Sequence, residues 1–533
     1  MAELQESQKK RKITFIAQNL ALCAATLFIA LVMAESVLRI RESWTERQEQ
    51  EKRTAQYLSQ IRQTDISDNT FNIYYFGEST IVGEPYAPRM TIPALTSYLL
   101  DNQVSGKPIR YINMAVQGAD FQYSLNCLQI VLKNKNIFKP SLVVIYAGHN
   151  EFLQDATDYG FIKLHFKYNN RLKGLLRRSL LLRKIVQMCG GKRQGYTLEI
   201  DQRHFFDEPL FSEKNYKQVI DKYKTEILQA VDMTQRQEVP CILSTVAGNY
   251  ADFEPNRSVY YGNPKDQNKF KTLADQGDSL QRAGNYRNAA LVYNQALAID
   301  ARFAEIHYRL GKCYHAMGEM DKARHEYEQA VEYDRMPIRA TPTQNEFIRK
   351  IPENKMLCIA DAVEYLRQRD DARLLGDSLM IDGHHPNLKG YILLSSFFAG
   401  KIRQISKDTR NVNFISEDIA TLLFKLDKKA WFDIYVSRGN WFYKTATIRY
   451  DPHERIQKAR SFFLKAFSID SSQSDATVGL ALCDLLENDP HRMTQLYLAQ
   501  IQQMEAADSK NYLKQNWVRQ IIDRARGKHP ASS

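Results

Sequence analysis

Four short polar blocks of this 533-residue chain carry residue types suited to nucleophilic acyl transfer. Ser79 follows a β-rich run that ends in Gly77, and His385 stands three residues after Asp382. A serine hydroxyl is a weak nucleophile until a base takes its proton, and a carboxylate must hold that base in one orientation. We therefore predict a catalytic triad of Ser79, Asp382 and His385.

Two further blocks offer hydrogen-bond donors for the charge that develops on an ester oxygen during attack. The backbone N–H of Gly118 and the side-chain amide of Asn150 each follow another β-rich run. Glycine at position 118 lets a substrate approach the backbone closely. We predict an oxyanion hole formed by Ser79, Gly118 and Asn150, where the loss of one donor typically costs ~10²–10³-fold in rate.

The elements that must position these residues alternate between strands and helices. Strands are predicted at 72–76, 109–113, 142–146 and 241–246, and helices near 91–103, 121–135, 215–235 and 388–403. Parallel strands need long crossovers, and helices supply them, so this order predicts a parallel sheet covered on both faces. The carboxyl ends of such strands share one edge, which brings the candidate residues together.

The four blocks resemble, in type and order, the SGNH (GDSL-type) family of esterases and lipases. They are Gly77-Glu78-Ser79, Asn113 to Gly118, Gly148-His149-Asn150-Glu151 and Asp382 to His385. The resemblance covers roughly 66–260 and 340–405. It implies an α/β fold of the flavodoxin-like three-layer type and the set Ser79, Gly118, Asn150 and His385, with Asp382 completing the triad. The family usually has Asp where Glu78 and Glu151 stand; both positions keep an acid here.

Residues 270–337 contain an internal repeat with a 34-residue period. The matched pairs are Gly277 and Gly311, Gly284 and Gly318, Ala289 and Ala323, Tyr293 and Tyr327, Ala296 and Ala330, and Asp300 and Asp334. Small residues at the approach of two helices, an aromatic knob and this period are typical of tetratricopeptide (TPR) helical hairpins. Such repeats favour a protein partner, although they could instead only brace the hydrolase domain.

A third, degenerate copy is predicted near the C-terminus. Ala459, Phe463, Ala466 and Asp470 repeat the spacing of the earlier second helices, but Thr447 stands where the glycine of the first helix is expected.

The N-terminal region predicts a membrane anchor. The stretch 13–33 is uncharged and long enough to cross a bilayer, and four basic residues at 9–12 precede it. The small residues at 32–34 could form a signal-peptidase site, but the apolar run is longer than a usual signal core, which favours an uncleaved anchor. We expect a single-pass protein of the inner (cell) membrane with its catalytic domain on the periplasmic or extracytoplasmic side.

The segment 161–193 holds ten Lys or Arg residues, no acid and interleaved apolar residues. Two interpretations are open: a cationic amphipathic helix on an anionic membrane surface, or a solvated helix packed on the sheet. The net charge of +12 is diffuse, and no nucleic-acid-binding module is present, so we expect no nucleic-acid partner.

The cysteines and histidines do not predict a metal or a cofactor. The seven cysteines are widely spaced and form no CxxC, and Cys127 and Cys241 are interpreted as buried apolar groups. His384 and His385 could bind a metal, but no second cluster of His or Cys accompanies them.

The predicted organisation has seven segments. They are a basic tail at 1–12, the anchor at 13–33, a stalk at 34–65, the first segment of the hydrolase domain at 66–263, TPR repeats at 264–337, the second segment of the hydrolase domain at 338–405 and a C-terminal helical TPR-like region at 406–533. The predicted function is a membrane-anchored serine esterase acting on an ester, with an acetyl group as one possibility, of a cell-envelope or exported glycan or lipid. The alternatives are an O-acetyltransferase that uses the same site and a non-catalytic TPR scaffold of an envelope assembly.

Overall fold

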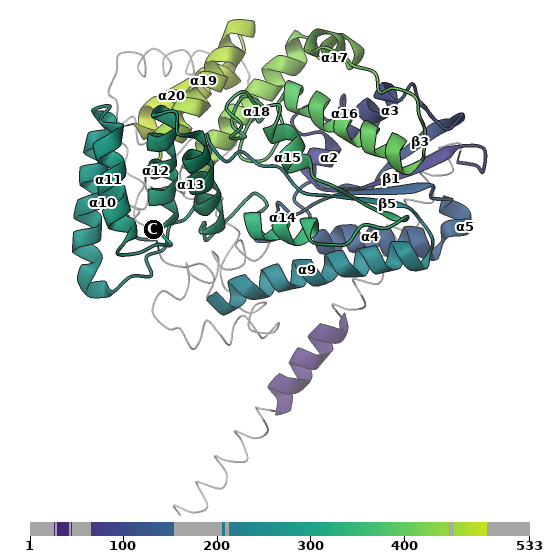
Figure 1. The fold of residues 1–533 in the computed structure, drawn as a ribbon, viewed down its shortest axis with the longest axis horizontal. Coiled ribbons are helices and arrows are strands. Elements are labelled where there is room, and N and C mark those ends of the chain that lie inside the picture. Colours follow the sequence, from purple (N-terminus) through teal and green to yellow (C-terminus); the bar gives the residue numbers. More distant parts are fainter. Residues whose placement is uncertain are drawn as a thin grey trace, which may run out of the picture. The chain divides into compact units, whose positions relative to one another are not determined.

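The computed structural model describes residues 26, 29–41, 44, 66–153, 205–207, 213–446, 449 and 451–487. The chain forms two compact units, one made of 1–64 and 157–194 and the other of 65–156 and 195–533. The strands and the labelled helices lie in the second unit (Figure 1). The predicted division into domains stays a prediction.

In the first unit, residues 29–41 form a short helix that includes residues 29–33 of the predicted anchor. This helix carries Glu35, Arg39 and Arg41, and Arg39 forms an exposed ion pair with Glu35 at 2.8 Å. No helix among the described residues is long and apolar enough to cross a membrane. On this finding, the predicted transmembrane helix at 13–33 and the predicted membrane location are wrong, and the described residues give no support for the predicted membrane partner. Of the span 13–33, only 26 and 29–33 are described.

A six-stranded sheet with the order β2-β3-β1-β4-β5-β6 forms the centre of the second unit. The strands are β1 (Phe71–Gly77), β2 (Gln103–Val104), β3 (Lys107–Asn113), β4 (Leu142–Tyr146), β5 (Cys241–Ser244) and β6 (Leu357–Ala360). Five of the six strands pair in parallel, in the order β3, β1, β4, β5 and β6. Tyr75 of β1 lies opposite Asn113 of β3 on one side and Val144 of β4 on the other. The carboxyl ends of β1, β3 and β4 therefore meet at one edge.

The predicted fold class is wrong in its sheet as well as in its membrane helix. β2 pairs with β3 in antiparallel fashion, so the sheet is mixed, not parallel as the flavodoxin-like assignment required. Ser105 and Gly106 join the two strands, and both have positive φ (47° and 79°). A two-residue connection of this kind closes a tight hairpin, which adds an edge strand without a helical crossover.

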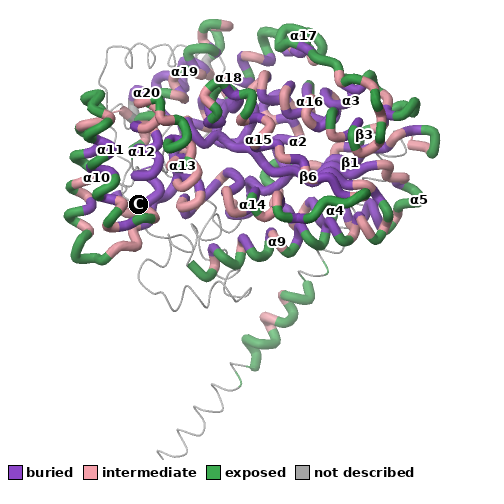
Figure 2. The backbone as a smooth tube through the Cα atoms, in the orientation of Figure 1, coloured by how far each residue is buried: buried purple, intermediate pink, exposed green. Residues whose placement is uncertain are grey.

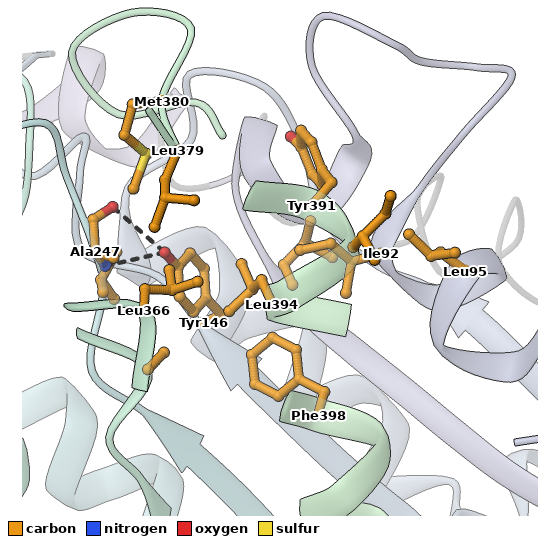
Figure 3. Packing of buried hydrophobic residues seen from close by; sticks show 14 of the residues in the cluster. Ile92, Leu95, Tyr146, Ala247, Leu366, Leu379, Met380, Tyr391, Leu394 and Phe398 are labelled. Carbon is orange, nitrogen blue, oxygen red and sulfur yellow. Dashed lines mark hydrogen bonds between the residues drawn. The ribbon is translucent and has the colours of Figure 1, made fainter. Parts of the chain in front are cut away.

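Helices cover the two faces of the sheet (Figure 1). α3 (Ile92–Leu99) and α16 (Leu388–Ile405) lie on one side, and α4 (Phe121–Lys133), α9 (Glu213–Arg236) and α14 (Pro342–Arg349) lie on the other. Figure 2 shows that burial is concentrated in the strands and in the helix faces turned toward them. In Figure 3, Leu394 and Phe398 of α16 pack against Tyr146, whose hydroxyl bonds to the backbone of Ala247.

The internal repeat forms two helical hairpins, α10 (Gln267–Arg282) with α11 (Tyr286–Leu297) and α12 (Ala304–Ala316) with α13 (Met320–Glu332). The repeated glycines lie against the repeated tyrosines: a Cβ at Gly277 would stand 2.3 Å from the ring of Tyr293, and one at Gly311 would stand 2.8 Å from Tyr327. The repeat therefore uses glycine because the two helices approach more closely than any side chain would allow.

A third hairpin of the same design occurs in α18 (Lys428–Ala446) and α19 (His453–Ile469), followed by α20 (Ser474–Leu486). Gly439 takes the place of the repeat glycine, because its added Cβ would lie 2.6 Å from Phe463. The prediction that this copy lacks the glycine is wrong. The interval between Gly439 and Phe463 is longer than the interval between glycine and tyrosine in the first two hairpins. A search at the shorter interval therefore finds Thr447 instead of the glycine.

The repeated aspartates attach the first two hairpins to the preceding loop. Asp300 accepts a hydrogen bond from Tyr261 N (2.7 Å), and Asp334 accepts from Asn256 N (2.8 Å) and Arg257 N (3.0 Å). Tyr308 and Tyr327 join the same buried cluster as the residues of β1 and β4. The inserted repeats therefore pack on the α/β region of the chain.

We predict that Gly439→Ala lowers the free energy of unfolding by about 1–3 kcal/mol, because Phe463 is confined between Gly439 and Gly479 and cannot move away from the new methyl group. Gly400→Ala is the matched control. Gly400 lies inside α16 with no atom within 4 Å of an added Cβ, and the change should stabilise by up to ~1 kcal/mol. Urea unfolding of both variants measures whether each change raises or lowers the free energy of unfolding. A neutral or stabilising Gly439→Ala would contradict the assignment of Gly439 as the glycine of the third hairpin.

Candidate active site

Ser79 stands at the carboxyl end of β1, as the first residue of the short helix α2 (Ser79–Val82). Gly77 is needed just before it, because a Cβ there would lie 2.3 Å from the carbonyl oxygen of Tyr146 on β4. Gly83 ends the helix with a φ of 105°, a conformation that favours glycine. The close strand contact and the sharp turn together fix where the serine side chain begins.

Asp382 and His385 lie in a tight loop that ends at α16. The backbone of Ile381 donates to the carbonyl of His385 at 2.9 Å, which closes the loop. One carboxylate oxygen of Asp382 accepts from the backbone N–H groups of His384 (3.0 Å) and His385 (2.8 Å). The other oxygen lies 2.7 Å from His385 Nδ1. The three-residue offset thus lets the carboxylate reach the near ring nitrogen while it binds its own loop.

The structure brings the three residues of the predicted triad together. His385 Nε2 lies 2.7 Å from Ser79 Oγ, and the two residues are 306 positions apart in the chain. All three are buried, and Asp382 is fully inaccessible. With Nδ1 bonded to the carboxylate, Nε2 is free to accept the proton of the serine hydroxyl.

The charges around the imidazole keep Asp382 ionised. Burial alone would raise the pKa of this carboxyl, but His385 and the guanidinium of Arg438 outweigh burial and hold the pKa well below its usual range. Burial lowers the pKa of His149 to about 3, and it also lowers that of His384, with His385 adding to both shifts. The two neighbouring imidazoles are therefore neutral at physiological pH.

The predicted oxyanion residues lie in the loops that follow β3 and β4. Val116 N donates to the carbonyl of Gly77 at 3.3 Å, which holds the Gly118 loop beside the start of the Ser79 helix. Gly118 has a φ of 70°, is exposed, and has open space where a Cβ would stand. Asn150 donates to the carbonyl of Ala119 at 3.1 Å, and its amide retains a second N–H.

Glu78 connects the serine loop to the asparagine loop. Its carboxylate is buried and accepts from Gly148 N (2.9 Å) and His149 N (3.1 Å). Burial raises the pKa of Glu78 to about 8, although the backbone donors oppose the shift. The longer side chain thus spans from the end of β1 to the backbone beyond β4.

Glu151, the second acid behind the site, binds the first residue of α4. Its carboxylate accepts from Phe121 N at 3.0 Å. Burial raises the pKa of Glu151 well above its usual value, and the nearby carboxylates of Glu78 and Asp120 add to the rise. Glu78 and Glu151 therefore both hold loops of the site in place through buried hydrogen bonds to the backbone.

Asp382, His384 and His385 offer ligand atoms within 4.8 Å of one another. The carboxylate oxygens of Asp382 and both ring nitrogens of His385 already serve the hydrogen bonds described above, so His384 alone keeps an uncommitted ring nitrogen. We interpret the three residues as members of the Ser79 site rather than as metal ligands.

Three contacts of the site could not be predicted from the sequence. Arg438 of α18 donates to the carboxylate of Asp382 at 2.5 Å. Ala340 N donates to His149 Nδ1 at 3.1 Å, and Gln344 donates to the carbonyl of Gly148 at 3.1 Å. The sequence carries no local signal for any of the three, because each depends on how segments far apart in the chain pack together. The basic segment 161–193 lies outside the described residues.

Comparison with known proteins gives a family match for the repeats. Residues 280–340 match the family model of the tetratricopeptide repeat. Sperm-associated antigen 1 of Mus musculus is 29% identical over 76 residues, which are 14% of this chain and 8% of the mouse protein. Its counterpart in Rattus norvegicus is 27% identical over 76 residues and 8% covered. The chain thus spans only a small share of the curated relatives that it matches.

Among solved structures, the chain is similar to a protein of Bacteroides fragilis that is described as an acylhydrolase. The identity is 12%, the TM-score is 0.27, and the match covers 66% of this chain and 95% of that one. A GDSL-like lipase of Bacteroides thetaiotaomicron gives 11% identity, a TM-score of 0.26 and coverage of 66% and 97%. Overlap this weak adds nothing to the site, whose interpretation depends on its own geometry.

We predict that stability falls as the pH rises from about 5 to 8. The pKa of Glu78 is about 8 in the folded chain against an ordinary value of 4.5, so the folded state holds a proton that the unfolded state releases in this window. One such proton lowers the free energy of unfolding by up to about 1.4 kcal/mol per pH unit. Glu78→Gln should make the decline shallower, as measured by urea unfolding at several pH values.

The control is Asp371→Asn, which changes an exposed acid outside the site and should leave the slope of stability against pH unchanged. A slope that is the same in Glu78→Gln and in the wild type would show that Glu78 does not hold the proton.

Proposed function

We propose that this protein is a serine esterase with Ser79 as its nucleophile. The observation that carries the proposal is the continuous hydrogen-bonded chain from Ser79 through His385 to Asp382, with 2.7 Å at each step. In this arrangement His385 takes the proton of Ser79 as the hydroxyl attacks an ester carbonyl. Asp382 stabilises the imidazolium that forms and fixes the tautomer that faces the serine.

The negative charge of the tetrahedral intermediate would be met by the N–H groups of Ser79 and Gly118 and by the free N–H of Asn150. The imidazolium of His385 then gives its proton to the departing alcohol, which leaves an ester between the acyl group and Ser79. Water, activated by the same imidazole, releases the acyl group. The proposed substrate is an ester of a glycan or a lipid, an acetyl ester among them.

We expect Ser79→Ala to abolish labelling by a fluorophosphonate probe, because the probe bonds to an activated serine oxygen. Asp382→Asn should slow hydrolysis of a short-chain chromogenic ester by about 10³–10⁴-fold, since the wrong tautomer of His385 would face the serine. Labelling measured by gel fluorescence and ester hydrolysis by absorbance test the two variants.

Ser396→Ala is the matched control, because Ser396 is a half-buried serine whose hydroxyl bonds within its own helix, to Ile392 O at 2.8 Å. It should be labelled like the wild type. Equal labelling of Ser79→Ala and the wild type would exclude Ser79 as the nucleophile. Product analysis with an added sugar acceptor separates hydrolysis from acyl transfer.

We also propose that the repeats bind a protein partner. A groove lies between α10, α12 and the start of α19, and its lining includes Arg282, Tyr286, Lys312, His315 and Glu454. We expect partner binding to survive Ser79→Ala and to weaken on reversal of the exposed charge of Arg282, as measured by pull-down with the full chain. Binding that is lost with Ser79→Ala instead would point to the catalytic site.

A further inference from the structure

We propose that Arg438 is a positioning residue of the triad: it fixes the Asp382 carboxylate from outside the α/β region and sets the pH range in which His385 acts as a base. This inference rests on the proposed esterase function. It concerns a residue of α18, in the region predicted to be only a TPR-like helical extension.

The geometry of Arg438 is that of a bridge between two carboxylates. Nη1 donates to Asp382 Oδ2 at 2.5 Å, and that same oxygen holds His385 Nδ1. Nη2 lies 3.4 Å from Glu84 Oε2 in the loop after α2. The side chain of Arg438 is 6% exposed, so water screens these charges poorly. Asp382 therefore shares one oxygen between the imidazole and a permanent cation.

Glu84 extends the bridge to the proposed oxyanion loop. Its second oxygen accepts a hydrogen bond from Gln117, the residue before Gly118. A chain of polar contacts thus runs from the Gly118 loop through Glu84 and Arg438 to Asp382. One side chain of α18 contacts both halves of the proposed catalytic machinery, directly at the triad and through Glu84 at the loop.

A purely structural role in docking α18 explains this arrangement less well. α18 is already attached by aromatic contacts: Trp431 packs on Tyr86 with 5.9 Å between ring centroids, and Phe442 packs near Phe253 at 6.3 Å. Burying a guanidinium costs free energy unless it is well paired, and an apolar residue of similar size often docks a helix equally well. Arg438 is buried against the Asp382 oxygen that orients His385, and a role in positioning that base explains why a cation is placed there.

The expected effect on pH dependence follows from the charges that face His385. These are Asp382 and His384 of its own loop, His149 after β4, and Arg438 of α18 with its partner Glu84. His149 and His384 are neutral. Arg438 opposes protonation of His385 by adding positive charge, and Glu84 partly offsets that charge. We therefore expect removal of the Arg438 charge to favour the protonated imidazole relative to the wild type.

The experiment measures the rate of fluorophosphonate labelling of the full chain against pH. We expect Arg438→Met to move the acidic limb of the profile to higher pH by about one unit, because the protonated imidazole is then better stabilised. Arg438→Lys keeps the charge and should hold the limb near its wild-type position while lowering the rate. Glu84→Gln removes the offsetting charge and should move the limb to lower pH.

Lys429→Met is the matched control, since it removes a cation from the same helix that pairs with the exposed Asp433. Its profile should match the wild type. Thermal melts of every variant verify folding; if Arg438→Met does not fold, the opposed behaviour of Arg438→Lys and Glu84→Gln decides.

Equal rate loss at every pH, with no movement of the limb in Arg438→Met or Glu84→Gln, would overturn the inference and leave Arg438 a structural tether. A wild type labelled no faster than Ser79→Ala would instead overturn the proposed esterase function, and this inference with it.

Discussion

The hydrogen bond between Ser79 and His385 is the constraint on which the rest of the structure depends. Two loops 306 residues apart must meet within 2.7 Å, and neither loop can be held by the bond alone. Additional contacts secure them. Thr80 Oγ1 donates to the carbonyl of His384 at 3.4 Å, and the hydroxyl of Tyr391 lies within hydrogen-bond distance of the carbonyls of Thr80 (3.1 Å) and Glu84 (2.7 Å). The first turn of α16 thus carries the histidine loop to the end of β1, where the sheet edge presents the serine.

The sequence predicted most of what is local and little of what depends on docking. The strand runs, the repeat glycines Gly277 and Gly311, and the juxtaposition of Ser79, Asp382 and His385 followed from residue types and their order. Arg438 could not be found that way, because nothing in the pattern of α18 marks an arginine that reaches a carboxylate 56 residues earlier. Gly439 was missed because the interval between glycine and aromatic partner is longer in the third hairpin, which breaks the fixed spacing. The predicted anchor rested on the length of an uncharged run and on the basic residues before it.

Buried charges explain why the helical hairpins and the α/β region form one compact unit. Glu254 lies 2.7 Å from Arg455 of α19 and 3.3 Å from Arg449, and Arg449 also pairs with Glu305 of α12 at 2.8 Å. Each of these groups is buried, and removing a single partner would leave an uncompensated charge in a poorly solvated place. The network therefore fixes how the repeats and the C-terminal helices pack on the loop after β5. Its net contribution to the free energy of unfolding is small by comparison.

The same logic makes the chain that leaves the repeats a structural component of the site. After α13 the backbone passes Arg339, which is buried and donates to the carbonyl of Phe253 at 2.6 Å, and Ala340 then donates to the imidazole of His149. Burial and His385 lower the pKa of His149 to about 3, so the imidazole is neutral at neutral pH. The bond from Ala340 N then requires the tautomer that carries its proton on Nε2. His149 lies next to Asn150. The backbone just before Asn150 is held as well, because Glu78 accepts from the N–H groups of Gly148 and His149 and Gln344 donates to the carbonyl of Gly148. The inserted repeats return to the sheet through this contact, so the position of the asparagine loop depends on an insertion that contributes no residue to the proposed triad.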